Sequence, residues 1–283
     1  MISPRAGRAE DEVTIRTIEV APGIAMLMGR GGNLGVSFGV DGVLVIDDQY
    51  ANLSNKILAA LAELSPEPLR YLINTHWHAD HTGGNENMAA AGAVIVAHDN
   101  VRRRMSQEQF NAAFNRKTPA SPAAALPVIT FSRDATIHLN GQALHAIHVE
   151  PAHTDGDAII YFEPANVVHA GDTYFNGIYP FVDFSSGGDP KGVIAAVDQI
   201  LAHIDDETQV IPGHGPLSNR KELVAYRAML STVCDRIAAA IAEGKTVDEV
   251  SEMKLTSDFD ANWGGGFLTP DQFVRILYAG LVD

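Results

Sequence analysis

The most informative segment of the sequence is Asn74-Thr75-His76-Trp77-His78-Ala79-Asp80-His81-Thr82-Gly83-Gly84. It follows an apolar run that ends at Ile73 and precedes a segment, 83–91, that favours a helix start. In extended backbone, side chains two residues apart face the same way, so His76 and His78 are expected to bind one metal ion as neutral imidazoles. Asp80 and His81 lie where the chain turns into the helix and are expected to face a second position. A solvated polar loop is the alternative, but four metal-competent side chains in H-x-H-x-D-H order are typical of a metal site.

The composition bounds the size and the partners of the protein. The chain has 283 residues, of which 46% are hydrophobic and 19% charged, enough for one large domain with a substantial core. Thirty-five acidic residues against 20 basic ones give a formal net charge of −15. Because this charge opposes binding to nucleic acid and to anionic membrane, we expect a small-molecule substrate. Oligomeric state is not readable from the sequence.

The single cysteine and the absence of long apolar runs exclude disulfide-stabilised and helical membrane-spanning classes of protein. A single cysteine, Cys234, excludes an intrachain disulfide and lies in an expected helix as a small, partly buried residue. No run approaches the ~20 apolar residues of a membrane span. Residues 1–12 are polar and lack an apolar h-region, so no signal peptide is expected. The compartment stays open between the periplasm, if a leader has been removed, and the cytoplasm.

Strands and helices alternate in both halves of the chain. Strands are expected at 13–20, 24–28, 34–40, 43–48, 69–73, 93–97, 128–131, 135–139, 142–149, 158–162, 167–170 and 209–211. Helices are expected at 51–64, 100–115, 191–204 and 221–243, with a helical tail over 247–283. The proline-rich segment 118–127 is expected to be a surface loop and a candidate flap. The alternation predicts an α/β fold, a four-layer αβ/βα sandwich of two mixed sheets with outer helices, in a single domain over 1–283.

Three further loops carry metal-competent side chains, and each follows an expected strand. His153 follows the strand 142–149, Asp172 follows 167–170, and His214 follows 209–211. Taken alone, each histidine is more often structural and the aspartate a turn or capping residue. Their common position after β-strands allows all three to meet the first loop, and this favours a shared site.

These signals resemble the metallo-β-lactamase-fold superfamily of metallohydrolases. The matching features are H-x-H-x-D-H from His76 to His81, the later His153, G-D-T at 171–173 and P-G-H-G at 212–215, in the expected order. The resemblance implies that His76, His78 and His153 hold one metal ion. It also implies that Asp80, His81 and His214 hold the other and that Asp172 bridges the two.

The donor set fits a pair of Zn²⁺ ions, with an open position left for water. Two zinc ions lower the pKa of a shared water, which then attacks a carbonyl as hydroxide, and Asp80 is the candidate catalytic residue that orients it. The predicted activity is hydrolysis of a cyclic amide or ester, with β-lactams as the most testable substrates. The alternatives are a thioesterase of the glyoxalase II kind or a lactonase, and an iron-dependent persulfide dioxygenase. The bridging Asp172 stands where β-lactamases of the superfamily commonly have Cys or Ser, which favours the other hydrolases.

Aromatic residues near the motifs are candidate contacts for the substrate. Trp77 lies between two expected ligands, and Tyr174 and Tyr179 follow Asp172 on an expected loop. A cavity wall of aromatic rings with a few polar anchors is typical of small-molecule sites. We therefore expect these three side chains to contribute to substrate binding.

Overall fold

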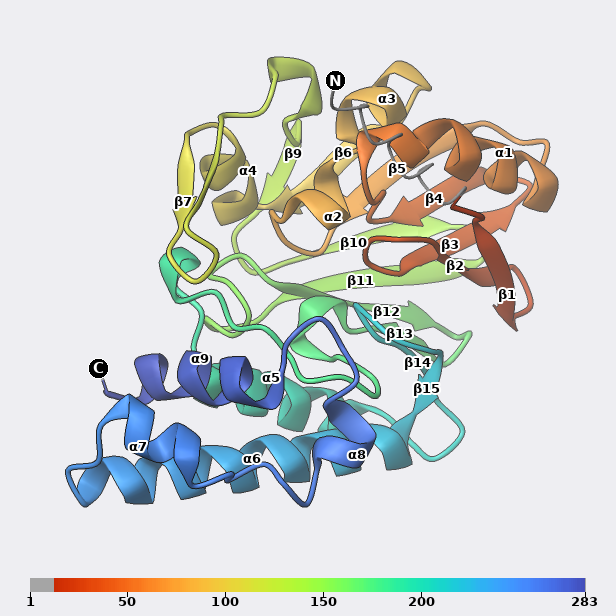
Figure 1. Ribbon diagram of the computed structural model, residues 1–283. Helices are drawn as coiled ribbons and strands as arrows, with labels where there is room; N and C mark the ends of the chain where they lie inside the picture. The colour runs from red at the N-terminus through yellow and green to blue at the C-terminus, as the bar shows by residue number, and fades with distance from the viewer. Residues whose placement is uncertain (1–12, 283) are drawn as a thin grey trace, which may run out of the picture.

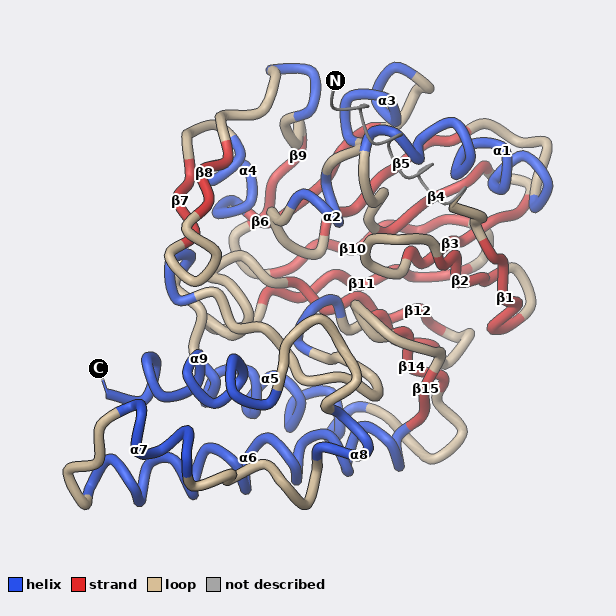
Figure 2. Tube along the Cα trace, in the orientation of Figure 1, coloured by secondary structure: helices blue, strands red, loops and turns tan. Residues whose placement is uncertain are grey.

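Two mixed β-sheets pack face to face in the computed structural model, which describes residues 13–282 (Figure 1). The first sheet has seven strands in the order β1-β2-β3-β4-β5-β6-β9, and the second has six in the order β10-β11-β12-β13-β14-β15. The hairpin β7-β8 stands apart from both sheets (Figure 2). The strands are β1 (Arg16–Ala21), β2 (Ile24–Met28), β3 (Leu34–Gly39), β4 (Gly42–Ile46), β5 (Leu69–Asn74), β6 (Val94–His98), β7 (Gln109–Asn111), β8 (Arg116–Thr118), β9 (Ile129–Phe131), β10 (Asp134–Leu139), β11 (Gln142–His148), β12 (Ala158–Glu163), β13 (Val167–His169), β14 (Gln209–Ile211) and β15 (Ser218–Asn219).

Helices cover the outer face of each sheet, as the four-layer sandwich requires (Figure 1). The first sheet is covered by α1 and α3, and the second by α5, α6 and α9. The helices are η1 (Ala51–Leu53), α1 (Ser54–Leu64), α2 (Ala79–Thr82), α3 (Asn85–Ala90), α4 (Asp99–Met105), η2 (Ala123–Ala125), η3 (Gly171–Thr173), η4 (Phe184–Ser186), α5 (Pro190–His203), α6 (Arg220–Ala242), α7 (Val247–Glu252), α8 (Asp260–Trp263) and α9 (Pro270–Val282). The predicted fold class is confirmed.

The strand sequences explain this layering, because both faces of the central strands are buried. In β2, Met26 packs in the core between the sheets, whereas Leu27 packs on the opposite face beneath α1. In β12, Ile160 faces the same inter-sheet core, and Ile159 faces α5 and α6. Successive side chains point to opposite faces of a strand, so a continuous apolar run is needed where both faces are covered.

Parallel pairing brings the ends of several strands to one edge of the sandwich. β4, β5 and β6 are parallel neighbours in the first sheet, and β13 and β14 are parallel neighbours in the second. Ligands bind outside the carboxyl ends of strands in open α/β sheets. The loops that follow β5, β11, β13 and β14 therefore meet at this edge.

One predicted helix is wrong over half of its length. The segment 100–115 was expected to be helical throughout, but α4 ends at Met105 and the chain continues into the β7-β8 hairpin. Gln109 pairs with Thr118 and Asn111 with Arg116 across the hairpin. The strands contain three residues each, too few to show an alternating pattern in the sequence.

The predicted helical tail forms α7, α8 and α9, and its last helix packs against α6. Phe273, Val274 and Leu277 of α9 are buried in the core outside the second sheet. This packing favours the single-domain organisation, which stays a prediction. The expectation about residues 1–12 lies outside the described residues. None of the helices between residues 13 and 282 is long and apolar enough to cross a membrane.

Candidate metal centre

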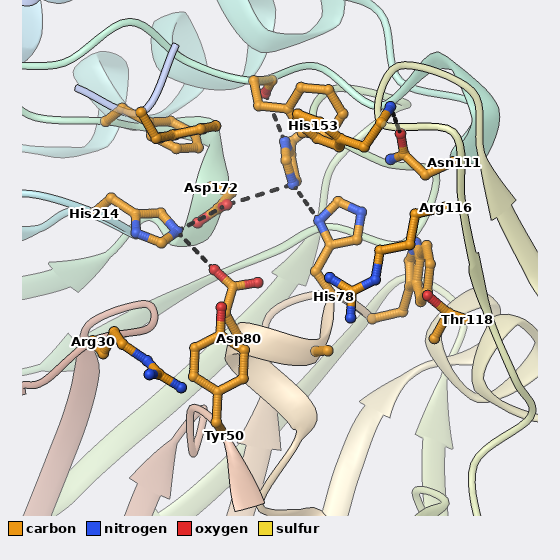
Figure 3. Close-up of a pocket in the computed structure, with 16 residues that line it drawn as sticks. Arg30, Tyr50, His78, Asp80, Asn111, Arg116, Thr118, His153, Asp172 and His214 are labelled. Carbon is orange, nitrogen blue, oxygen red and sulfur yellow. Dashed lines mark hydrogen bonds and ion pairs between the residues drawn. The ribbon is translucent and has the colours of Figure 1, made fainter. Parts of the chain in front are cut away.

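The structure brings the seven predicted metal ligands together at the edge where the strand ends meet (Figure 3). They form two groups, and the candidate ligand atoms within each group lie within 4.8 Å of one another. The first group is His76, His78, His153 and Asp172, and the second is Asp80, His81 and His214. The ligands before residue 100 come from the loop after β5 and from α2, and the others come from loops of the second sheet.

The first group is a set of imidazole nitrogens that face one another. His76 Nε2 lies 3.1 Å from His78 Nδ1, and His153 Nε2 lies 2.9 Å from the same atom. The opposite nitrogen of each ring faces an acceptor. His78 Nε2–H donates to Asp183 Oδ2 at 2.8 Å, and His153 Nδ1–H donates to the Phe181 carbonyl at 2.8 Å.

The outer nitrogen of His76 also faces an acceptor, which is the hydroxyl of Thr75. The Thr75 hydroxyl donates to Asp47 Oδ2 and therefore accepts from His76 Nδ1–H at 3.0 Å. With a proton on each outer nitrogen, the three inner nitrogens carry lone pairs. Lone pairs at 2.9–3.1 Å repel one another, and a shared cation removes that repulsion. The donor set therefore fits a metal ion.

The second group places a carboxylate beside two imidazoles. His81 Nε2 lies 3.3 Å from His214 Nε2, and Asp80 Oδ2 lies 3.3 Å from His214 Nε2. Asp172 lies between the groups, with Oδ2 at 3.5 Å from His153 Nε2 and 3.4 Å from His214 Nε2. Asp172 Oδ1 is buried and lies 3.1 Å from His81 Nε2, a nitrogen of the second group. A buried carboxylate oxygen of this kind fits a second cation.

Burial and neighbouring charges set the protonation of these groups. Burial lowers the pKa of His153 to about 4, and burial and the nearby His81 hold the pKa of His76 well below its usual value. Burial disfavours a charge on His81, but Asp172 and Asp80 raise its pKa well above the usual value. The same negative field that favours a proton on His81 Nε2 favours a metal cation there.

Two aspartates outside the predicted set hold the ligands in place. Asp183 accepts the hydrogen bond from His78 and another from the Ser186 hydroxyl at 2.7 Å. Asp47, with a left-handed φ of 60°, accepts from His81 Nδ1–H at 2.7 Å and from the backbone N–H of Thr75 at 2.8 Å. Such partners fix the tautomer and the orientation of metal-binding imidazoles. No spacing pattern in the sequence marks either role, because Asp183 is 105 residues from His78 and Asp47 is 34 residues from His81.

Two glycines allow the loops to approach the cluster. A Cβ at Gly213 would overlap Asp172 Oδ1, and a Cβ at Gly32 would overlap the His81 ring. Gly32 also donates its N–H to the Asp80 carbonyl at 3.0 Å. Only residues without a side chain allow this packing.

The cluster forms one wall of an open cavity of about 480 Å³. Trp77 lines it, as predicted, and donates its Nε1–H to Ser186 Oγ at 3.0 Å. The other lining residues outside the metal cluster are Arg30, Tyr50, Ala79, Asn111, Phe114, Arg116, Thr118, Phe175, Phe181 and Phe267. No glycine pattern or strand-end position marks the hairpin residues among them in the sequence.

Tyr174 and Tyr179 lie outside the cavity, in contrast to the expectation. Both are fully buried in the core beneath the second sheet. Tyr174 shares a hydrogen bond with Ser218 Oγ at 2.7 Å, and Tyr179 donates to Asp260 Oδ1 at 2.8 Å and stacks on Phe273. Alternation along extended backbone explains the first case, because Phe175, the residue after Tyr174, faces the cavity instead; Phe181, two residues after Tyr179, also lines the cavity.

The sandwich fold and the His/Asp cluster at its open edge define a metallohydrolase. The chain belongs to the metallo-beta-lactamase superfamily, whose family model matches residues 39–216. A hydroxyacylglutathione hydrolase from Polaromonas sp. is 28% identical over 208 residues, which cover 70% of this chain and 71% of that protein.

Solved structures show the same fold. A metallo-beta-lactamase from Pontibacter korlensis matches with a TM-score of 0.64 at 18% identity, covering 77% of this chain and 99% of its own. A stereoselective inverting sec-alkylsulfatase from Pseudomonas sp. matches with a TM-score of 0.70 at 18% identity and covers 93% of this chain. The match covers 50% of the sulfatase. At this identity the likeness concerns the fold alone.

Proposed function

We propose that the chain is a dinuclear zinc hydrolase that cleaves the carbonyl group of a cyclic amide or ester, with β-lactams as the first substrates to test. The observation that supports this most directly is the convergence of six His and Asp side chains around Asp172 on the wall of an open cavity. Nitrogen and carboxylate donors in this mixture suit Zn²⁺.

Each side chain has a separate role in the proposal. His76, His78 and His153 hold one zinc ion, Asp80, His81 and His214 hold the other, and Asp172 contacts both. When bound, the two ions lower the pKa of a water toward neutrality and polarise the substrate carbonyl.

Asp80 is the candidate catalytic residue among these side chains. It is the most exposed of the carboxylates in the cluster, with 25% of its side chain accessible, so it accepts a hydrogen bond from the attacking water and orients it. The cavity walls bind the apolar part of the substrate.

Thioester hydrolysis is the second candidate, and the name of the Polaromonas relative favours it. The same cluster serves both reactions, because each begins with attack of water on a carbonyl carbon. The two differ in the leaving group, which is a ring amide nitrogen in one case and a thiolate in the other. A lactone, whose leaving group is an alkoxide, belongs to the first candidate.

Hydrolysis of a chromogenic cephalosporin by the zinc-loaded protein tests the proposal, with a chelator-stripped sample as its control. Metal-dependent turnover supports β-lactam hydrolysis. No turnover by a sample holding two zinc ions per chain would contradict it, and the same sample is then assayed with S-lactoylglutathione and a γ-lactone. Metal analysis adds an independent readout, because one iron per chain with oxygen consumption on a persulfide would contradict the hydrolase itself.

A further inference from the structure

The arrangement of the cavity rim points to a substrate that carries a carboxylate group, which Arg30, Arg116 and the Tyr50 hydroxyl bind away from the scissile carbonyl. This inference rests on the proposed hydrolase function and narrows its substrate class. Figure 3 shows the two guanidinium groups approaching the space beside Tyr50 and Asp80 from opposite sides. We call these three residues the anion clamp.

Arg30 owes its position to the loop between β2 and β3. The loop sequence is Gly29-Arg30-Gly31-Gly32, so Arg30 is the only one of these four residues that has a side chain. A Cβ at Gly31 would lie 2.7 Å from the Asp80 carbonyl oxygen, and one at Gly32 would overlap His81. The Gln49 amide donates to the Gly32 carbonyl at 2.7 Å and anchors the loop. The loop therefore packs against the metal ligands and presents a single arginine to the cavity.

Tyr50 connects the two arginines. The Arg30 guanidinium lies over the Tyr50 ring, with Cζ 5.2 Å from the ring centroid. Burial and the nearby Asp80 raise the pKa of the Tyr50 hydroxyl, while Arg30 and Arg116 both oppose this rise. Arg30, Tyr50 and Arg116 all line the same cavity. The hydroxyl keeps its proton at neutral pH and can donate it to a bound anion.

Arg116 reaches the cavity from the β7-β8 hairpin, which is docked on the rest of the molecule. The N–H of Ala112 donates to Ser185 Oγ at 2.9 Å, and the Phe114 ring lies 4.9 Å from the Phe181 ring. Asn111 is the cross-strand partner of Arg116 and also lines the cavity. The docked hairpin therefore holds an arginine and a side-chain amide opposite the Arg30 loop.

The two arginines carry unneutralised charge in an acidic protein. Six arginines of residues 13–282 form an ion pair with an aspartate, and the others form none: the paired ones are Arg103, Arg104, Arg220, Arg227, Arg236 and Arg275. Within residues 13–282, neither Arg30 nor Arg116 has a carboxylate within 4.0 Å. The carboxylates of the cavity, Asp80 and Asp172, are those of the metal cluster. Guanidinium groups bind carboxylates through paired, charge-assisted hydrogen bonds, so a substrate carboxylate is the matching partner.

The rest of the wall fits the remainder of such a substrate. Phe114, Phe175 and Phe181 line the same cavity, with Phe175 stacked on His214 and Phe181 beside His153. A substrate with a carboxylate for the clamp, a carbonyl in reach of the cluster and an apolar part for these rings matches all three features.

Matched esters test the clamp in the zinc-loaded full-length protein. Mono-4-nitrophenyl glutarate carries a free carboxylate, and its methyl ester is the neutral counterpart with the same leaving group. We expect Arg30→Gln and Arg116→Gln each to lower the ratio of kcat/KM for the anionic ester to that for the neutral ester roughly tenfold. Arg133→Gln removes the same charge from an exposed position outside the cavity and should leave the ratio unchanged.

An unchanged ratio in both cavity variants, including an equal loss on both esters, would overturn the inference. If the wild-type protein hydrolyses neither ester, the proposed function fails for these substrates. A binding experiment then tests the anion clamp independently of hydrolysis. Quenching of tryptophan fluorescence by 4-phenylbutyrate and by 4-phenylbutanamide gives their dissociation constants. Tighter binding of the carboxylate that Arg30→Gln and Arg116→Gln weaken supports the clamp. A preference that survives in both variants contradicts it.

Discussion

The Asp80 carboxylate lies at the cavity surface, 3.3 Å from His214 Nε2 and 3.7 Å from His81 Nε2. Asp80→Asn keeps the shape of the side chain but removes its negative charge and its ability to accept a proton. We expect kcat to fall by about 10²-fold or more, with a melting temperature within a few degrees of the wild type. Steady-state kinetics and thermal unfolding measure both. Asp134→Asn, at an exposed position far from the cavity, is the control, and full turnover by Asp80→Asn would contradict its assigned role.

Asp183 accepts a hydrogen bond from the imidazole of His78, so under the proposed function it is a positioning residue that would act on the metal ion through that ring. Asp183→Ala removes the acceptor for His78 Nε2–H, so the ring loses its fixed tautomer and orientation. We expect zinc affinity to fall about 10- to 100-fold, measured by competition with a chromophoric chelator. Asp183→Asn keeps an acceptor oxygen and should recover part of the affinity. Equal affinities for the wild type and Asp183→Ala would show that the contact does not support the metal.

Burial makes Cys234 chemically inert. The thiol is 5% exposed in α6, and burial raises its pKa to about 12. Because the thiolate is the reactive form, a raised pKa leaves roughly one thiol in ten thousand ionised at pH 8. We expect iodoacetamide to modify Cys234 slowly in the folded protein and rapidly after denaturation, as read by mass spectrometry. Equal rates would contradict the buried placement.

At the scale of single residues, the sequence identifies the candidate metal ligands better than the residues that hydrogen-bond them or line the cavity. The motif from His76 to His81 and the strand-end positions of His153 and His214 were enough to propose a common site. Asp183 and Arg116 belong to the site through the folding of distant loops, and no local pattern distinguishes them from other polar residues. Tyr174 and Tyr179 show the converse, because nearness to Asp172 in sequence did not predict which rings face the cavity.

The β2-β3 loop is the element that closes one side of the cluster, and its glycines are a structural requirement. In Gly32→Ala, the added methyl group would overlap the His81 ring. We expect the ring to be displaced and bound metal to fall by about one ion per chain. Inductively coupled plasma mass spectrometry measures the loss. Gly265→Ala is the matched control, because a Cβ there meets nothing within 4 Å. Unchanged metal content in Gly32→Ala would contradict the packing.

Among the elements, those with a long apolar pattern were predicted well. The strand Ile24–Met28 and the helix start and end near α5 and α6 follow directly from burial and from their polar caps, Asp189 and Asn219. The β7-β8 hairpin could not be predicted in this way, because its strands are short, largely polar and paired with no sheet. It nevertheless supplies one arginine of the anion clamp, so the poorly predicted element carries part of the specificity.

At the scale of the whole molecule, the candidate metal ligands come from both sheets. His76, His78, Asp80 and His81 follow a strand of the first sheet, whereas His153, Asp172 and His214 follow strands of the second. Ions that bind the folded chain and not the unfolded one stabilise it in proportion to the logarithm of their concentration over Kd. Metal removal should therefore loosen the edge of the sandwich as well as abolish activity.

The stabilisation of the folded chain by zinc depends on the ratio of the zinc concentration to Kd. With free zinc at a thousandfold excess over Kd, one site contributes about 4 kcal/mol, and each kcal/mol shifts the melting temperature of a chain this long by about 2–4 °C. Two such sites contribute about 8 kcal/mol, so we expect a chelator-stripped sample to melt roughly 20 °C below the zinc-loaded one, measured by scanning calorimetry. Restoring zinc should restore the higher temperature, while His214→Ala should retain a smaller shift because one group of ligands stays intact. An equal melting temperature with and without bound metal would mean that the ligands are held in place by the fold alone, and that the two sheets do not depend on the ions for their contact.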